Sequence, residues 1–139
     1  MAYEFLDHTA DLKIRATGKT LEEALVEAAK AVTEAIAGDS KIEAKIEKEF
    51  EVKIHLEHVL VHDFLQEIIY MFSTEKLLFS EFNVTLKEAL GYKLTARLKG
   101  EKYDPKKHKL VKEVKAATYH ELKVEKGDKG WAIEVICDT

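Results

Sequence analysis

Two kinds of hydrophobic spacing divide this chain into predicted strands and helices. Over residues 12–17 and 49–56, apolar and polar side chains alternate strictly, which is typical of a half-buried strand. Over residues 21–36 and 57–73, apolar side chains recur every three or four positions, which indicates amphipathic helices. Further strand-like runs lie at residues 77–86, 92–99, 110–125 and 131–137.

The residues at the ends of these runs support the assignment. Thr20 and Glu23 form a capping box at the start of the first helix, and Gly38 offers a C-terminal cap. The sequence KGDKG at 126–130 predicts a hairpin turn between the last two strands. A length of 139 residues, 46% of them hydrophobic, is enough for one core and too short for two. We therefore predict an α+β fold, a single two-layer domain over residues 1–139, in which a mostly antiparallel or mixed sheet of about six or seven strands packs one face against both helices.

Composition narrows the class of protein. A formal net charge of -4 argues against a protein that coats nucleic acid through general positive charge, and no apolar stretch is long enough to span a bilayer. The N-terminal sequence MAYEFLDHTAD has acids where a signal peptide needs a basic region and then an apolar one. The only cysteine, Cys137, cannot form an internal disulfide. We therefore expect a cytoplasmic protein without a membrane partner.

Acidic residues lie at the ends of the first and last alternating strands. If these strands pair antiparallel, matching their apolar faces places Leu12 opposite Cys137 and, one position farther, Asp11 opposite Asp138. The Cβ atoms of the two acids would then lie roughly 5 Å apart, whereas parallel pairing would separate them by roughly 20 Å. The same register matches the other apolar positions: Ile14 with Val135 and Ala16 with Ile133.

Two carboxylates at this distance, next to the terminal carboxylate of Thr139, require either a cation between them or retention of a proton. Asp11, Asp138 and Thr139 offer oxygen ligands, which suit calcium or another hard divalent cation such as magnesium better than zinc. Asp7 and His8 are candidates for additional ligands or for hydrogen bonds to the ligands. The alternative is that Asp7 and Asp11 form ordinary turns and that Asp138 lies in a frayed terminus.

Two other clusters offer weaker chemistry. His58 and His62 have a spacing that can bind zinc, but Val59 occupies the position of the glutamate in zinc proteases, so we interpret both histidines as surface or helix-start residues. Residues 102–115 contain six lysines and two acids and could contact phosphate, although a solvated edge is the simpler interpretation. Lys115 lies inside a strand-like run, where its charge requires solvent or a partner. The sequence contains no glycine-rich phosphate loop, nucleophile elbow or Cys–His pair, so it gives little support for catalysis.

Several stretches, in order along essentially the whole chain, resemble the archease family: YEFLDHTADLKIRATG, TLEEAL, FLQEIIY, VKAATYHELKV and a terminal CD followed by one residue. The resemblance implies a small, non-enzymatic activator of an RtcB-type RNA ligase, which joins tRNA halves and other cleaved RNAs through a covalent ligase–guanylate intermediate. The activator promotes formation of this intermediate and repeated turnover, and RNA is contacted only through the ligase. The resemblance also implies a metal site at Asp11, Asp138 and Thr139, and a role in ligase activation for Lys115 of the VKA motif. Thr139 departs from the family pattern, which commonly ends in an aliphatic residue.

Two alternatives remain open. A metal-dependent hydrolase would use the same carboxylates to activate water, with His8 as the only nearby candidate for a general base. A stand-alone RNA-binding module would use the lysines of residues 102–115 and would bind RNA with a steep salt dependence.

Overall fold

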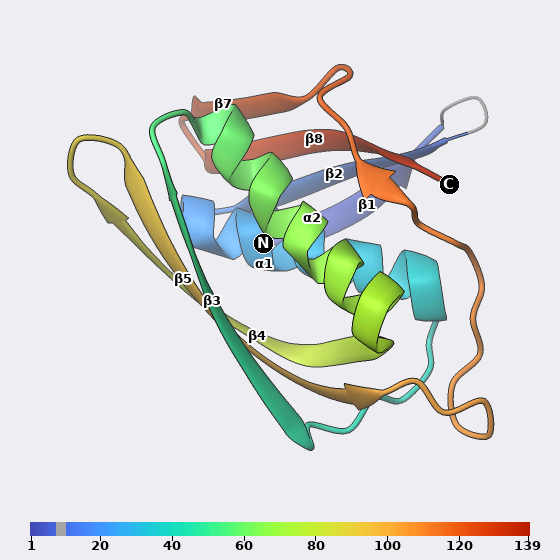
Figure 1. Cartoon of the computed structure of the whole chain (residues 1–139). Coiled ribbons are helices and arrows are strands. Elements are labelled where there is room, and N and C mark those ends of the chain that lie inside the picture. Colours follow the sequence, from blue (N-terminus) through green and yellow to red (C-terminus); the bar gives the residue numbers. More distant parts are fainter. Residues whose placement is uncertain (8–10) are drawn as a thin grey trace.

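The computed structural model describes residues 1–7 and 11–139, which form two helices and eight strands (Figure 1). The helices are α1 (Leu21–Ala37) and α2 (Glu57–Glu75). The strands, in chain order, are β1 (Ala2–Leu6), β2 (Leu12–Gly18), β3 (Ile46–Ile54), β4 (Leu77–Glu88), β5 (Tyr92–Lys102), β6 (Ala116–Ala117), β7 (Lys123–Gly127) and β8 (Gly130–Asp138).

The strands divide into two antiparallel sheets. The first has the order β1-β2-β8-β6, and β7 also pairs with β8. In the second, β5 lies between β3 and β4. The predicted α+β class, with antiparallel strands and two helices, is confirmed. One difference from the prediction is that the strands assigned to one sheet form two.

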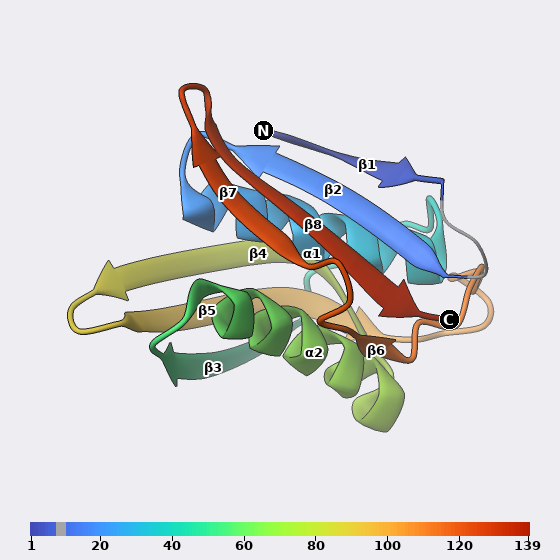
Figure 2. The ribbon, with the colours of Figure 1, turned by 90° about the horizontal axis from the view of Figure 1, so that it is seen from above.

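Helix α1 lies between the two sheets, as Figure 2 shows, and packs against β2 and β8 on one side and β4 on the other. The reason is that the buried side chains of α1 cover a wide arc of the helix, so they face more than one neighbouring layer. The small buried residues of α1 let both sheets approach the helix axis closely: Ala24, Ala28, Ala29, Ala31, Ala35 and Ala37. The apolar periodicity of the sequence indicated one buried face and did not reveal the second.

The ends of α1 carry the predicted caps. The Thr20 hydroxyl accepts a hydrogen bond from the Glu23 backbone N–H at 3.2 Å, and the Glu23 carboxylate accepts one from the Lys19 N–H at 2.7 Å. At the other end, the Gly38 N–H donates to the Glu34 carbonyl oxygen. Helix α2 packs against β3 of the second sheet and against β6 of the first.

One cluster of buried apolar side chains connects both helices with both sheets. Its largest fully buried members include Phe64 of α2, Phe79 of β4 and Ile14 of β2. Of the helices that the described residues form, neither has the length and apolar character needed to cross a membrane.

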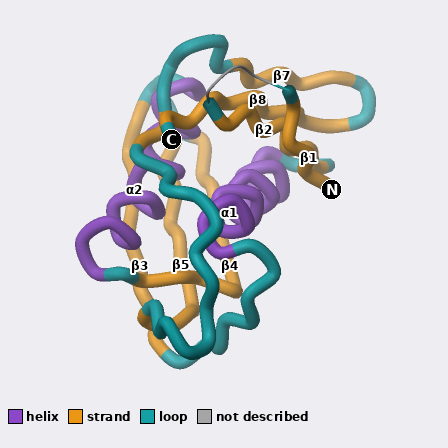
Figure 3. Tube along the Cα trace, turned by 90° about the vertical axis from the view of Figure 1, so that its right-hand side faces the viewer, coloured by secondary structure: helices purple, strands orange, loops and turns teal. Residues whose placement is uncertain are grey.

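Residues 103–115, which we call the strap, cross from β5 of the second sheet to β6 of the first (Figure 3). The prediction of a continuous strand over 110–125 is wrong, because only β6 and β7 form strands in this part of the described chain, and neither the strap nor residues 118–122 does. Single hydrogen bonds hold the backbone of the strap instead. The Lys109 N–H donates to the Ser40 hydroxyl at 2.9 Å, and the Val111 N–H donates to the Ile36 carbonyl oxygen at 2.8 Å.

Candidate metal and partner-contact site

Strands β2 and β8 pair in the register that the sequence predicted. They are antiparallel, and the ladder contains all three predicted pairs: Leu12 with Cys137, Ile14 with Val135, and Ala16 with Ile133. All six of these side chains are buried. A shift by one residue would turn this apolar set toward the opposite face, so burial fixes the register.

Asp11 and Asp138 lie at the end of this ladder. Asp11 directly precedes Leu12 and Asp138 directly follows Cys137, so the register extended by one residue sets the two acids across from each other. Residues directly opposed in an antiparallel ladder have Cβ atoms about 5 Å apart, and this is the spacing expected for the two acids. Asp11 is half-buried, Asp138 is exposed and Thr139 is partly exposed. The two carboxyl groups and the chain terminus therefore share one end of the first sheet.

Lys115 lies at the same end of the sheet. Its backbone N–H donates to the carbonyl oxygen of Asp138 at 2.8 Å, and the next residue, Ala116, pairs with Asp138 in the ladder. Because β8 lies between β2 and β6, Asp138 lies between Asp11 and Lys115. Two strand spacings separate the backbones of Asp11 and Lys115, which corresponds to about 10 Å. Figure 2 shows the C-terminus beside β6 and the start of β2. The Lys115 side chain is exposed.

The donor groups at this end of the sheet are oxygens. Among residues 1–7 and 11–139, no three or more His, Cys, Asp or Glu side chains are grouped so as to hold a metal ion. If a cation binds here, a third ligand from the described chain would be a backbone oxygen, the Thr139 hydroxyl or the terminal carboxylate of Thr139. Cys137 lies next to Asp138, but burial and the charge of Asp138 raise the pKa of its thiol to about 12, so it stays protonated. This chemistry fits a hard divalent cation such as calcium and not a thiolate-bound metal.

A hollow of about 520 Å³ opens beside the acids. Asp7 and Asp11 line it together with the apolar side chains of Phe5 and Val111. Asp7, which we predicted as an additional ligand or hydrogen-bonding partner, therefore lies at the same hollow as Asp11. His8, the other predicted contributor, lies outside the described residues.

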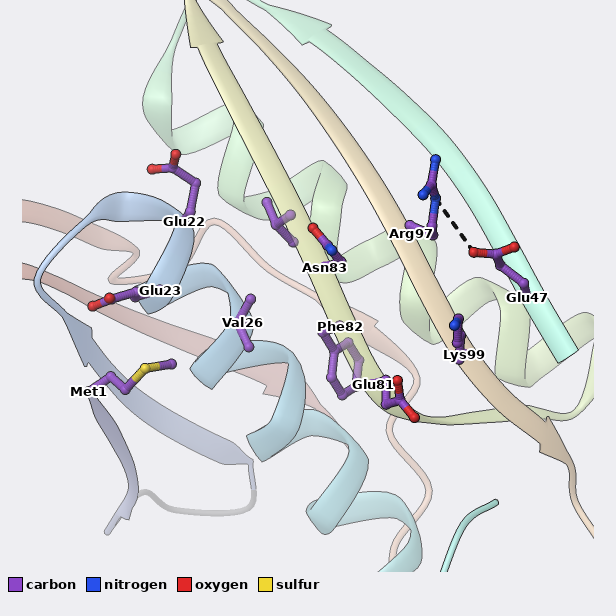
Figure 4. A pocket seen from close by; sticks show the side chains of 11 residues that line it. Met1, Glu22, Glu23, Val26, Glu47, Glu81, Phe82, Asn83, Arg97 and Lys99 are labelled. Atoms are coloured by element: carbon purple, nitrogen blue, oxygen red, sulfur yellow. Dashed lines mark ion pairs between the residues drawn. The ribbon is translucent and has the colours of Figure 1, made fainter. Parts of the chain in front are cut away.

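A second hollow, of about 530 Å³, lies between the start of α1 and strands β4 and β5 (Figure 4). Its charged side chains include Glu22 of α1, Glu81 of β4 and Lys99 of β5. Arg97 of β5 forms an ion pair with Glu47 at 3.5 Å. None of the described residues that line this hollow carries an imidazole, hydroxyl or thiol group, so it contains no serine or cysteine nucleophile paired with a histidine.

The strap carries less free positive charge than its sequence suggests. The Lys107 ammonium lies 2.8 Å from the Glu101 carboxylate and 3.4 Å from that of Glu43. A hydrogen bond from the Glu43 N–H, together with Lys107, lowers the pKa of Glu101 to about 2, so this carboxylate is charged. Lys107 therefore anchors the strap to β5, whereas the exposed lysines of its second half are Lys109, Lys112 and Lys115.

One residue near Lys115 has contacts that its sequence context did not predict. His62, interpreted as a surface or helix-start residue, lies on α2 with its side chain 19% exposed and its Nε2 atom 3.1 Å from the Ala117 carbonyl oxygen. His58, one turn earlier, is exposed as interpreted. Helical spacing could not reveal the difference, because the partner of His62 lies 55 residues away in the chain.

Known proteins similar to this chain cover almost its full length. A model of the Archease protein family matches residues 3–139. Protein archease from Pyrococcus furiosus is 40% identical over 138 residues, which covers 98% of this chain and 97% of that protein. The solution structure of Methanobacterium thermoautotrophicum protein 1598 has a TM-score of 0.87 and 34% identity, and covers 99% of both chains. The crystal structure of an archease, possible chaperone, from Thermotoga maritima has a TM-score of 0.64 and 26% identity, and covers 96% of this chain and 94% of that one.

Proposed function

This chain belongs to the archease family, and from this premise we propose that it is a non-enzymatic activator of an RtcB-type RNA ligase. In this role it promotes guanylylation of the ligase and its repeated turnover in tRNA splicing and RNA repair, in the cytoplasm. The observation that carries the proposal is the convergence of Asp11, Asp138 and Lys115 at one end of the first sheet. Carboxylates beside an exposed ammonium group are suited to contact a nucleotide-binding site. Carboxylates bind metal ions there, and an ammonium group binds phosphates.

Asp11, Asp138 and the terminal residue Thr139 would hold the cation, which we propose to be calcium or another hard divalent ion such as magnesium. Like charges about 5 Å apart repel each other, and this gives the acid pair a physical reason to bind a cation. A cation held by these residues would either bridge to oxygen atoms of the ligase or order this end of the sheet. Asp7 and His8 are proposed to support the ligands through hydrogen bonds.

Lys115 provides the ammonium group that faces the ligase. Its main chain is fixed to Asp138, whereas its side chain extends into solvent. An ammonium group binds phosphate oxygens well, so the expected contact is with the nucleotide phosphates of the ligase. In this role the protein contacts RNA only through the ligase. The pairing of Lys107 with Glu101 and Glu43 leaves the strap with less positive charge for direct RNA binding.

A guanylylation assay tests this function. The transfer of labelled guanylate from GTP to an RtcB-type ligase is measured with and without this protein, and ligated RNA is then counted per ligase molecule. We expect the protein to increase both quantities and to join, cleave or hydrolyse nothing by itself.

Three outcomes would contradict this proposal. An unchanged ligase would contradict it directly. RNA cleavage or nucleotide hydrolysis by this protein alone, lost in Asp138→Ala, would favour a metal-dependent hydrolase. RNA binding without the ligase, weakening steeply as salt rises, would favour an RNA-binding module.

A further inference from the structure

The main chain that follows Lys115 is held from two sides. On one side it pairs with β8, where Ala117 lies opposite Cys137 and the Thr118 N–H donates to the Ile136 carbonyl oxygen at 3.0 Å. On the other side it lies against α2, as Figure 2 shows. Strand β6 is only two residues long and is the last strand in the order of its sheet. Its backbone groups that point away from β8 therefore depend on side chains of α2.

Two side chains of α2 bind both backbone groups of Ala117. The Gln66 side-chain oxygen accepts a hydrogen bond from the Ala117 N–H at 2.9 Å. His62 Nε2 lies 3.1 Å from the Ala117 carbonyl oxygen, and since a carbonyl can only accept, this nitrogen is the donor of that hydrogen bond. A turn of α2 thus takes the place that a further strand would occupy.

The imidazole ring of His62 is itself fixed by two neighbours. Its Nδ1 atom lies 2.9 Å from a carboxylate oxygen of Asp63, which can only accept, so this contact is a hydrogen bond when Nδ1 also carries a proton. Its face stacks on the ring of Tyr119, with 4.2 Å between the ring centroids and an interplanar angle of 14°. His62 therefore contacts the segment after Lys115 at two places, the Ala117 carbonyl and the Tyr119 ring.

We propose that His62 is a positioning residue for Lys115. By holding the main chain at Ala117, about 7 Å along the chain from Lys115, it determines where the Lys115 ammonium group is presented. This inference rests on the proposed function, because the group that Lys115 faces belongs to the ligase. An apolar side chain of similar size would fill the same space but would leave the Ala117 carbonyl oxygen without its donor.

Three variants separate positioning from packing. His62→Ala removes the donor and the ring. His62→Gln keeps an N–H donor at the end of a side chain of comparable reach, so it should restore part of the function. His58→Ala is the matched control, because it removes an exposed histidine one turn earlier on the same helix.

Amide hydrogen exchange, measured by NMR on the protein alone, tests the contact between His62 and Ala117. We expect the amides of Lys115, Ala117 and Thr118 to exchange about tenfold faster in His62→Ala, which is the effect of losing roughly one net hydrogen bond. The increase should be smaller in His62→Gln and absent in His58→Ala. Unchanged exchange in His62→Ala would overturn the inference.

A double-mutant cycle in the guanylylation assay tests the role toward the ligase. His62→Ala should lower the maximal activated rate several-fold, while the concentration of this protein that gives half of the effect stays within about twofold of wild type, because the rest of the contact surface is intact. In a Lys115→Ala background, the same change should have no further effect. Losses that multiply in the double variant would show that His62 acts elsewhere and would overturn the inference.

The two proposals fail in different ways. Normal activation by His62→Ala would overturn the inference alone, provided that wild-type protein activates the ligase and Lys115→Ala does not. Failure of wild-type protein to activate would overturn the proposed function and this inference with it.

Discussion

Lys115 and Asp138 are joined through their backbones, since the N–H of Lys115 donates to the carbonyl oxygen of Asp138 at 2.8 Å. Neither side chain takes part in this bond. The lysine and the acid can therefore be replaced one at a time without removing the contact that holds the strap to β8. Effects on the chemistry of the site can thus be separated from effects on the fold.

Lys115→Ala should change function and not stability. The side chain is exposed, so we expect the free energy of unfolding to stay within about 1 kcal/mol of wild type. Ligase guanylylation should fall strongly because the ammonium group is lost. Urea denaturation and the guanylylation assay measure the two effects, with Lys109→Ala, another exposed lysine of the strap, as control. Equal activation by both variants would contradict the role of Lys115.

Asp11→Ala and Asp138→Ala should abolish stabilisation by calcium. A ligand that binds only the folded chain raises the melting temperature by mass action, and this site exists only when the two chain ends are paired. Without metal, both variants should melt close to wild type or slightly above it, because repulsion between like charges is relieved. A calcium titration followed by thermal melting measures this. Asp128→Ala, in the turn between β7 and β8, is the control because it removes an exposed acid elsewhere on the same strand pair. Equal calcium shifts in all of these proteins would mean that the acids are only turn residues.

Deleting Thr139 should weaken calcium binding less than either aspartate variant. The terminal carboxylate is then carried by Asp138, so one ligand moves instead of disappearing.

In wild type the calcium affinity should also fall as the pH is lowered, because carboxylates bind the cation well only when ionised. Calorimetric titration at several pH values tests both statements. An affinity independent of pH would argue against carboxylate ligands.

The pairing of the chain ends could be predicted because apolar residues alternate on both strands. The antiparallel register with Leu12 opposite Cys137 places the apolar residues of both strands on the same face, whereas a slip by one residue would turn one set away. The placement of Asp11 beside Asp138 follows from that register. The caps of α1 were also predictable, because Thr20, Glu23 and Gly38 act within one turn of their own positions.

The division into two sheets and the course of the strap depend on contacts between distant residues. Alanine gives a weak apolar signal, so Ala28 and Ala31 did not reveal that α1 is buried between two layers. Leu110 and Val111 continue an apolar pattern but are exposed, because the strap is held by single hydrogen bonds and not by a ladder. His62 shows the same limit, since its role depends on a carbonyl oxygen in β6.

Gly100→Ala should destabilise the fold. Gly100 of β5 lies opposite Phe79, beside the irregularity in β4, and a Cβ atom there would collide with the Leu78 carbonyl oxygen. The two strands would have to separate, so we expect the free energy of unfolding to fall by about 1–3 kcal/mol. Gly127→Ala is the control, because apart from Gly127 and its two chain neighbours no atom of the described residues lies within 4 Å of the Cβ position. Similar urea denaturation curves for both variants would contradict this account.

Glu101 joins the strap to the second sheet through a buried carboxylate that is 5% exposed. It accepts hydrogen bonds from the Glu43 N–H at 2.7 Å and from the Lys107 ammonium at 2.8 Å. His108 Nδ1 accepts from the Asp104 N–H, so Nε2 carries a proton and donates it to Glu101 at 3.1 Å. These donors all favour the ionised carboxylate, and together they lower its pKa from 4.5 to about 2.

Glu101→Gln should therefore reduce stability at neutral pH and weaken its dependence on acid. In wild type, the contribution of the carboxylate is fully present above pH 4.5 and is lost as the pH falls toward 2, because the unfolded chain takes up the proton first. The variant keeps an oxygen for the Glu43 N–H but loses the charge that Lys107 faces, which should cost about 1–3 kcal/mol at neutral pH. The difference in unfolding free energy between wild type and variant should shrink steadily between pH 4.5 and about 2 in urea denaturation. Glu125→Gln, an exposed glutamate of β7, should show no such convergence. A constant difference across this range would contradict the assignment of this acid sensitivity to Glu101.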